Sequence, residues 1–392
     1  MRYLFQLLII TTVFMIPGCY SDYQMPMHQV DCHVDFSNHA RHHALQGILD
    51  RFAEELPGLA VTVTDADGQV WSGASGFANI EENELMTPCH LQYGASIIKS
   101  YVSISILQLI EIGELAMDDQ ISDHLSEEIL ALLPQVDGVT IEHLLTHTSG
   151  WKDVFEISFL TDYFNDPMAT YTTAEFLKYI KNTKPIGKPG EQHYYSDANF
   201  MILTIIIDQI TGSHIRYIEQ NILEPLSLND TYYHNKDYPN MHGIAAAYMD
   251  QYSDGRLENV SLKLNHLTSQ IHGGGGIIST PSDLAGFVDG VFDGRLIGGE
   301  TLDQILTTRF ENENEEQSHS HYGYGFMFIP DEEHGDWIGH TGLQIGAASY
   351  VYRNIETGAT ISVMTNIGTF FSNHYMSVVY GHLWYELVEA IH

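Results

Sequence analysis

The sequence predicts an α+β fold in which the N- and C-terminal segments build one antiparallel sheet flanked by helices, with a mostly helical lobe inserted between them. Strand-like segments of alternating apolar residues occur near the N-terminus and again past Tyr322. The stretch between them, about 97–310, carries apolar residues at helical spacing and few strand patterns. The strands of both ends are therefore expected in one sheet, with the lobe beside it.

The body of the protein, residues 39–392, is expected to open with a helix and a hairpin. Apolar residues recur at helical spacing over 39–56, and a proline-glycine pair ends this segment. Two strand-like segments follow, 59–63 and 70–77, and a turn-rich loop separates them. The chain therefore begins its fold as helix, strand, strand.

Helices dominate the middle of the chain. We expect one that begins after Ser96, a short one from Ile141 to Leu145 and another over 200–210. The sequence also predicts where a fourth helix begins, because Thr280 can cap it, a proline follows, and Asp283 occupies the third position. Past Tyr322 the strand patterns and a last helix close the fold, at 324–329, 336–339, 347–352, 360–365 and about 372–391.

The amino-acid composition and the net charge exclude some classes of function. At 392 residues, with 44% hydrophobic and 11% aromatic content, the chain can bury a large core. Lys and Arg number 16 against 51 Asp and Glu, which gives a formal net charge of -35. This charge repels phosphate backbones and anionic membrane surfaces, so a nucleic-acid partner is not expected.

The N-terminus has the pattern of an export signal, because one positive charge precedes an apolar run too short to span a membrane. We expect a signal peptide over 1–18 and a polar tether over 19–38. The signal ends in Ile-Pro-Gly-Cys19, which resembles the site where bacterial lipoproteins are cleaved and lipidated, although Pro17 departs from the usual residue and ordinary cleavage is the alternative. The protein is thus expected to be exported, either periplasmic or held at the membrane only through a lipid on Cys19.

Two further cysteines, Cys32 and Cys89, remain if Cys19 carries lipid. An oxidising periplasm could join them in a disulfide. Two free thiols are the alternative, because the sequence does not give the distance between them.

The first segment that could carry out catalysis is Tyr-Gly-Ala-Ser96-Ile-Ile-Lys99, at the start of an apolar helix. Residues three apart lie on one helix face, so the hydroxyl and the amine can meet, and an amine that loses its charge can activate a serine. The spacing alone is a weak signal, since Ser149 and Lys152 repeat it within a loop. An ordinary N-cap serine is the alternative for Ser96.

Two other segments carry candidate groups. Tyr195 and Asp197 stand on a turn just before the helix over 200–210, where a phenol could relay a proton; a tyrosine that only packs a loop is the alternative. His340, Thr341 and Gly342 lie in a strand-forming region, where glycine allows a substrate to approach the backbone of an edge strand. A plain polar strand is the alternative there.

Together these segments resemble those of the serine β-lactamase and penicillin-binding-protein superfamily, and within it the class C β-lactamase and D-alanyl-D-alanine carboxypeptidase branch. The resemblance covers residues from about Ala40 to the C-terminus. It includes His147-Thr-Ser-Gly150 and the glycine-rich turn Gly274-Gly-Gly-Ile-Ile-Ser-Thr280. It implies a β-lactamase/transpeptidase-like fold.

The resemblance also implies roles for individual residues. Ser96 would be the acylated nucleophile, Lys99 the group that moves its proton and Tyr195 the second acid/base group; which of the last two acts as base in acylation stays open. The backbone N–H groups of Ser96 and Leu343 would form the oxyanion hole. No cofactor is implied, and histidine clusters such as His39, His42 and His43 lack the spacing that favours a metal.

Some positions depart from the family pattern. Asp197 stands where asparagine is common and should form an ion pair with Lys99. Leu343 replaces a hydroxyl residue that helps to hold a substrate carboxylate, and no arginine follows Tyr322 in the next strand region. A carboxylate would then be held by Thr341 and by a protonated His340.

We therefore expect a serine hydrolase that acts on a small molecule or peptide through an acyl-enzyme on Ser96. A D-Ala-D-Ala carboxypeptidase-like peptidase on peptidoglycan-type peptides is the first candidate. An esterase or β-lactamase of the same fold is the second. The departures from the pattern weaken the carboxypeptidase and β-lactamase interpretations and favour an esterase or amidase that acts on uncharged acyl groups. A binding protein without activity is the third, and the retention of Ser96, Lys99 and Tyr195 argues against it.

Overall fold

The computed structural model describes residues 30, 32–234, 243–311, 321–369 and 372–392. The expected signal peptide, Cys19 and most of the expected tether lie outside these residues. Within the described part of the chain, no helix is long and apolar enough to cross a membrane.

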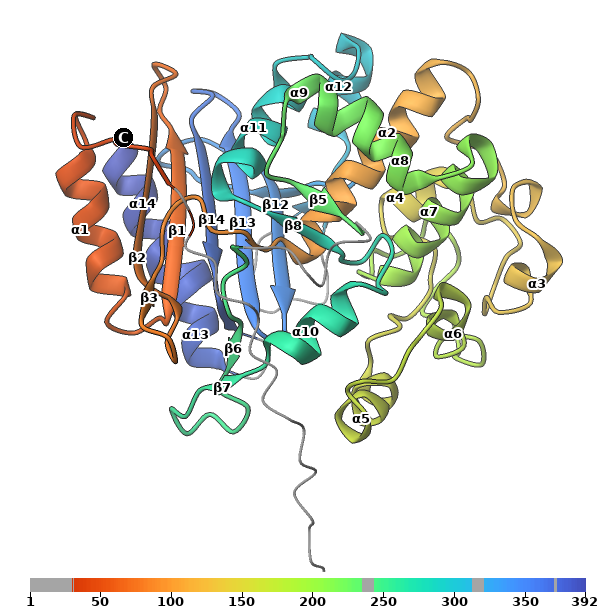
Figure 1. Ribbon diagram of the computed structural model, residues 1–392. Helices are drawn as coiled ribbons and strands as arrows, with labels where there is room; N and C mark the ends of the chain where they lie inside the picture. The colour runs from red at the N-terminus through yellow and green to blue at the C-terminus, as the bar shows by residue number, and fades with distance from the viewer. Residues whose placement is uncertain (1–29, 31, 235–242, 312–320, 370–371) are drawn as a thin grey trace, which may run out of the picture.

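A nine-stranded antiparallel sheet forms the centre of the molecule (Figure 1). Strand β1 pairs with β14 along its whole length, so the two ends of the chain meet in one sheet and this expectation is confirmed. The sheet runs in the order β3 (Glu84–Leu85), β2 (Val70–Asn79), β1 (Gly58–Thr64), β14 (Thr360–Thr365), β13 (Ala347–Asn354), β12 (Trp337–Gln344), β11 (Met327–Ile329), β10 (His321–Tyr322) and β9 (Phe310–Glu311).

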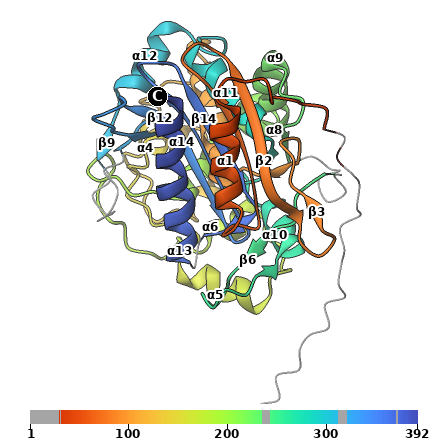
Figure 2. The same ribbon diagram turned by 90° about the vertical axis from the view of Figure 1, so that its left-hand side faces the viewer.

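Helices cover both faces of this sheet. On one face lie α1 (His42–Phe52) and the C-terminal helix, which consists of α13 (Asn373–Ser377), a π-helical turn (Val378–Leu383) and α14 (Trp384–Ile391), as Figure 2 shows. The buried face of α1 repeats at helical spacing, with Leu45, Ile48, Leu49 and Phe52. On the other face, α11 (Pro281–Phe292) packs against β1, β13 and β14 although it belongs to the middle of the chain.

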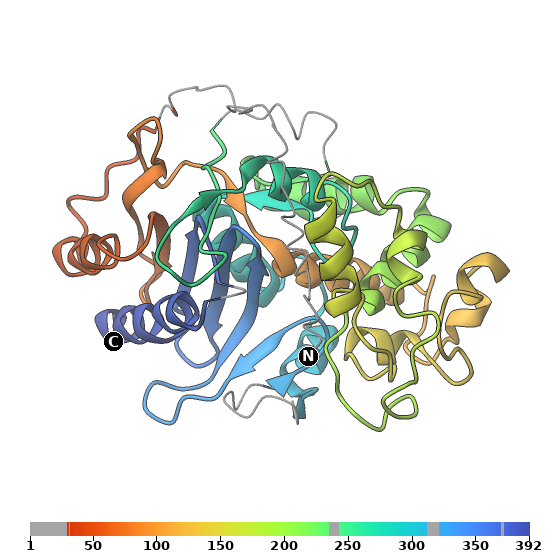
Figure 3. The same ribbon diagram turned by 90° about the horizontal axis from the view of Figure 1, so that it is seen from below.

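The remaining helices form a lobe beside the sheet with one continuous apolar core (Figure 3). Its centre is the contact between α2 (Ile98–Glu111) and α7 (Asp197–Thr211), two helices that are buried on nearly every side. The other helices of this part of the chain are α3 (Glu127–Leu130), α4 (Ile141–Leu145), α5 (Ile157–Asn165), α6 (Thr173–Leu177), α8 (His214–Ile218), α9 (Glu224–Leu226), α10 (Ser261–Thr268) and α12 (Gly299–Thr307).

Two small three-stranded sheets complete the described elements. One is ordered β4 (Gln92–Tyr93), β8 (Ile277–Ser279) and β5 (Tyr232–Tyr233), and it leads directly into the turn before α2. The other is ordered β15 (Ile367–Gly368), β6 (Tyr248–Met249) and β7 (Glu258–Asn259). These short strands tie the middle of the chain to the main sheet.

The expected strand over 324–329 is interrupted, and the reason is tertiary. The chain turns at Gly325, which has a positive φ of 74° and whose N–H donates to Leu145 O. Ser103 and Ser100 on α2 donate to the carbonyl oxygens of Tyr324 and Gly325, at 2.7 Å in both cases. This turn leaves the sheet to bind α2, so β10 and β11 form as two short strands.

Candidate active site

Ser96 lies on a 3₁₀ turn, Ala95–Ile97, that leads into α2. Ala95 adopts a positive φ of 50°, a conformation that costs free energy for any residue with a Cβ and is held here by the surrounding structure. Ser96 is not a helix cap, because its Oγ donates to the carbonyl oxygen of Gly274 at 3.4 Å. The turn thus leaves the hydroxyl partly exposed above a buried helix.

Lys99 is fully buried one turn below the serine. Its Nζ lies 3.0 Å from Ser96 Oγ, 2.5 Å from Asp197 Oδ1 and 3.5 Å from Gly274 O. The three acceptors match the three protons of an ammonium group, and a buried charge is tolerated only when it is paired in this way. The ion pair that the sequence suggested for Asp197 is therefore present in the structure.

A buried histidine, His147, fixes the turn that carries Tyr195 and Asp197. Its Nδ1 accepts hydrogen bonds from Ser196 N at 3.2 Å and from Asn199 Nδ2 at 3.0 Å, so the ring proton must lie on Nε2. Burial lowers the pKa of His147 well below its ordinary value. The neutral ring therefore serves as a fixed acceptor at the start of α7.

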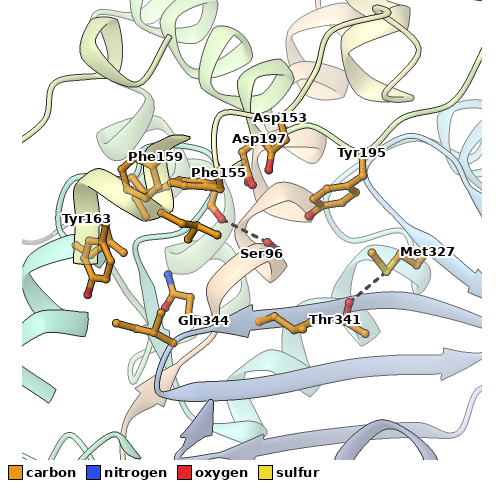
Figure 4. A pocket seen from close by; sticks show the side chains of 16 residues that line it. Ser96, Asp153, Phe155, Phe159, Tyr163, Tyr195, Asp197, Met327, Thr341 and Gln344 are labelled. Carbon is orange, nitrogen blue, oxygen red and sulfur yellow. Dashed lines mark hydrogen bonds between the residues drawn. The ribbon is translucent and has the colours of Figure 1, made fainter. Parts of the chain in front are cut away.

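Tyr195 faces the nucleophile across the cavity. Lys99 Nζ lies 4.8 Å from the centroid of the Tyr195 ring, and the His147 ring packs against that ring at 4.4 Å. Figure 4 shows the Tyr195 hydroxyl pointing toward Ser96. The structure thus brings Ser96, Lys99, Tyr195 and Asp197 together from two separate segments of the chain.

The second copy of the serine-lysine spacing does not form such a pair. Ser149 donates to Asn199 Oδ1 at 2.6 Å, whereas Lys152 points elsewhere and contacts Glu156 at 3.4 Å. Only the copy at the start of an apolar helix therefore assembles a site.

The strand β12 borders the site with an unpaired edge. It pairs with β13 as far as Gln344, but its pairing with β11 ends at Gly339. A Cβ placed on Gly342 would lie 2.2 Å from Gly94 O, in the segment that precedes Ser96. We expected this glycine to admit a substrate; in the structure it admits the turn that carries the nucleophile.

The orientation of the Gly342–Leu343 peptide follows from one tyrosine. Tyr380 Oη lies 2.7 Å from Gly342 O and 3.5 Å from Ser349 O, so both carbonyl oxygens face the space between β12 and β13. No described peptide bond is cis. The N–H of Leu343 therefore points the opposite way, to the free edge beside the Ser96 turn, where an oxyanion-hole donor is needed.

His340 does not have the role that we expected. It is fully buried and does not line the cavity. Its Nδ1 donates to Thr341 O at 2.6 Å, and its Nε2 accepts from Tyr322 Oη at 3.2 Å. Burial and the charge of Lys99 lower the pKa of His340 to about 3, so the expectation of a protonated His340 that holds a carboxylate is wrong. Thr341 does line the cavity, and its hydroxyl donates to Met327 Sδ at 3.4 Å (Figure 4).

Ser96 opens into a cavity of about 320 Å³ with mostly apolar walls. Most of this lining was not predicted from the sequence, including Asp153, Gln344 and three aromatic residues from the α5 region. The aromatic residues Phe155, Phe159 and Tyr163 recur every four positions, a helical spacing that could have indicated a common wall. Asp153 follows the histidine segment of the family resemblance, but its direction is set only by the fold.

One group in the described part of the chain could hold a metal ion, formed by Glu333, His334 and Glu389. None of these residues lines the cavity at Ser96. Exposed acidic groups are common without a metal, and the group has no place in the chemistry of the site.

The fold and the paired Ser96 and Lys99 place the chain in the class of serine hydrolases. The chain belongs to the Beta-lactamase family, whose model matches residues 45–376. It is similar to Protein flp of Staphylococcus aureus (strain MW2), with 26% identity over 189 residues, which are 48% of this chain and 37% of that protein. It is also similar to the acyltransferase mokF of Monascus pilosus, with 28% identity over 279 residues, 64% of this chain and 66% of that protein. The match thus spans well under half of the Staphylococcus relative.

Solved structures share the architecture. The D-amino acid amidase of Ochrobactrum anthropi SV3 in complex with D-phenylalanine has a TM-score of 0.77 at 24% identity, over 90% of this chain and 98% of that one. The D-stereospecific amidohydrolase of a Streptomyces species has a TM-score of 0.74 at 23% identity, over 86% and 97%. The octameric penicillin-binding protein homologue of Pyrococcus abyssi has a TM-score of 0.72 at 25% identity, over 87% and 78%. Family, fold and site geometry together support a serine hydrolase.

Proposed function

We propose that the protein is an amidase that cleaves small D-aminoacyl amides through an acyl-enzyme on Ser96. The observation that carries the proposal is the cavity at Ser96, which is walled by aromatic and aliphatic side chains and, among its described lining residues, has no lysine, arginine or histidine. An amide releases an uncharged or cationic amine, and this leaving group needs no basic anchor. The names of two structural neighbours, a D-amino acid amidase and a D-stereospecific amidohydrolase, support the D configuration.

A D-Ala-D-Ala carboxypeptidase is less well supported. Such a substrate carries a free carboxylate on its leaving residue, and neither Asp153 nor Asp197 offers it a positive charge. With His340 buried and neutral, only the Thr341 hydroxyl remains of the groups that we expected to hold it. An esterase of the same specificity is the second candidate, because an ester also releases an uncharged leaving group.

The proposed reaction has two halves. Ser96 Oγ attacks the carbonyl carbon of the substrate, and the N–H groups of Ser96 and Leu343 stabilise the oxyanion. The three protons of Lys99 are committed to Ser96, Asp197 and Gly274. The Tyr195 hydroxyl, which points toward Ser96 in Figure 4, would therefore accept the serine proton as it gives its own proton to the leaving nitrogen. The amine departs, and water then hydrolyses the ester on Ser96 by the reverse proton path.

The proposal is tested by labelling and turnover. Purified protein is treated with a fluorophosphonate probe, a fluorescent penicillin and the amides of D- and L-phenylalanine, in parallel with Ser96→Ala. Ser105→Ala is the matched control, because Ser105 lies on the same helix and only donates to Tyr101 O. We expect fluorophosphonate label and preferential hydrolysis of the D-amide in wild type and Ser105→Ala, and neither in Ser96→Ala. Absence of label and of turnover in the wild type would refute the proposal, and strong penicillin labelling would favour a β-lactam-binding function.

We also propose that the protein is exported. The structure joins Cys32 and Cys89 in a disulfide, a bond that persists mainly in oxidising compartments. Expression in a Gram-negative host with the natural N-terminus should place the protein in the membrane fraction, and Cys19→Ala should release it. Unchanged partitioning of Cys19→Ala would reject the lipid anchor.

A further inference from the structure

The cavity contains a carboxyl group that the proposed reaction does not use. Asp153 lies on the loop before α5 and lines the same cavity as Ser96. Its Oδ1 accepts hydrogen bonds from Asp197 N at 2.8 Å and from Val154 N at 2.7 Å. Both hydrogen bonds reach the same oxygen, and Oδ2 accepts neither of them. Figure 4 shows the side chains of Asp153 and Asp197 next to each other above Ser96.

The charges around Asp153 do not balance. Lys99 is the cation nearest the nucleophile, and it forms its short ion pair with Asp197. Among the described lining residues the carboxyl group of Asp153 has no cation of its own. Burial and the negative charge of Asp197 raise the pKa of Asp153 to about 8, although Lys99 partly opposes them, so the carboxyl group is mostly protonated at pH 7 until a cation lies beside it.

We propose that Asp153 is the binding site for a free ammonium group on the acyl part of the substrate. The proposal rests on the amidase function above and specifies its substrate class as aminoacyl amides with an unblocked amine. The carbonyl carbon would lie at Ser96, the ammonium group at Asp153 and the apolar side chain against Phe155 and Phe159, which line the cavity beside them. A cation bound at this place would replace the proton of Asp153, which passes to solvent, and would stabilise the carboxylate.

The wider electrostatics favour the same ligand. The chain carries a formal net charge of -35, and such a field attracts cations toward a cleft that already contains two carboxyl groups. The apolar walls lower the local dielectric constant, which strengthens a charge-assisted hydrogen bond between ammonium and carboxylate. A blocked amine could not form this contact, and its acyl cap would have to occupy the space beside the carboxyl group.

Asp153 also has a structural role, and the test must separate that role from the binding of the ammonium group. Its Oδ1 accepts the N–H of Asp197, the first residue of α7, and so caps this helix. The substitution Asp153→Asn keeps an acceptor oxygen at that position and removes only the ability to ionise when a cation binds. Glu156→Gln is the matched control, because Glu156 lies three residues further on, pairs with Lys152 and does not line the cavity.

The experiment compares D-phenylalanine amide with its N-acetyl derivative in the wild type and both variants. We expect the wild type to prefer the free amine, and Asp153→Asn to lower kcat/KM for the free amine by about 10- to 100-fold, mainly through KM. The N-acetyl substrate should change by less than about threefold, and Glu156→Gln should behave as wild type. An equal loss on both substrates would overturn the proposal, because it would indicate a structural role only.

A second measurement needs no variant. Phenethylamine and 2-phenylethanol have the same shape and differ in charge, so they are compared as inhibitors of fluorophosphonate labelling of the wild type. We expect the amine to protect Ser96 at about tenfold lower concentration, and equal protection would contradict an ammonium site. Fluorophosphonate labelling without this preference would reject the Asp153 proposal alone, whereas complete absence of labelling and turnover would reject the hydrolase function itself.

Discussion

Lys99 and Asp197, which are 98 residues apart in the chain, form a buried ion pair with Nζ and Oδ1 2.5 Å apart. The pair joins α2 to α7, the two central helices of the lobe, directly beneath the nucleophile. Because Asp197 is the first residue of α7, the helix N-terminus also favours its negative charge. The pair therefore serves the fold and the chemistry together.

The first prediction concerns this pair. Asp197→Asn leaves the Lys99 ammonium buried without a counter-charge, so we expect the free energy of unfolding at pH 7 to fall by about 3 kcal/mol, measured by urea denaturation. The double variant Lys99→Met, Asp197→Asn contains no buried charge at this place and should recover part of the loss. If Lys99→Met destabilised the Asp197→Asn protein as much as it destabilises the wild type, the two side chains would act independently. The loss of stability in Asp197→Asn would then not come from a broken ion pair.

The second prediction concerns the oxyanion hole. Tyr380→Phe removes the hydroxyl that holds the Gly342 carbonyl and so loosens the peptide that carries the Leu343 N–H. We expect kcat to fall by about tenfold with little change in KM, since the donor acts on the transition state. Tyr385→Phe, on the same C-terminal helix but 62% exposed, is the control and should leave the kinetics unchanged. A rise in KM without loss of kcat would contradict the assignment.

The third prediction concerns His340 and pH. Its pKa in the folded protein is about 3, below the ordinary 6.5, so the unfolded chain takes up the proton first as pH falls. The stabilisation by His340 is thus complete above pH 6.5 and is lost progressively toward pH 3. Between pH 6.5 and pH 5 the wild type should lose about 2 kcal/mol more than His340→Gln. Equal losses in the two proteins would show that His340 is not held neutral.

The fourth prediction concerns the disulfide between Cys32 and Cys89, which closes a loop with a sequence separation of 57. Loop-closure entropy gives an upper estimate of about 4 kcal/mol for the stability lost on reduction. Urea denaturation with and without reductant measures this loss, and the variant Cys32→Ser, Cys89→Ser should be insensitive to reductant. A wild type with equal stability in both conditions would refute the prediction.

Strong local patterns predicted much of the fold. The bounds of β14 and α4 coincide with the expected segments 360–365 and 141–145, because alternation and capping were both clear there. Thr280 caps α11 through Asp283 N as expected. The expected strand over 324–329 was wrong in its first half and right over Met327–Ile329, because hydrogen bonds from α2 hold a turn at Tyr324 and Gly325, and a single sequence does not record such partners.

The site was predictable where chemistry depended on spacing along one helix and not where it depended on burial. Ser96 and Lys99 meet because they are one turn apart. His340 lies in the expected strand, but its burial behind the cavity wall, and hence its neutral state, follows from packing around Tyr322. Asp153 was not predicted as a site residue, because its position at the cavity depends on its hydrogen bond to the start of α7.

The central claim, that Ser96 carries the acyl group, is tested most directly by mass spectrometry. The wild type is mixed with the methyl ester of D-phenylalanine, quenched in acid during turnover and digested. We predict a phenylalanyl adduct on the peptide that contains Ser96, together with complete loss of adduct and turnover in Ser96→Ala. Turnover that persists in Ser96→Ala, or an adduct found only at another residue, would contradict the account.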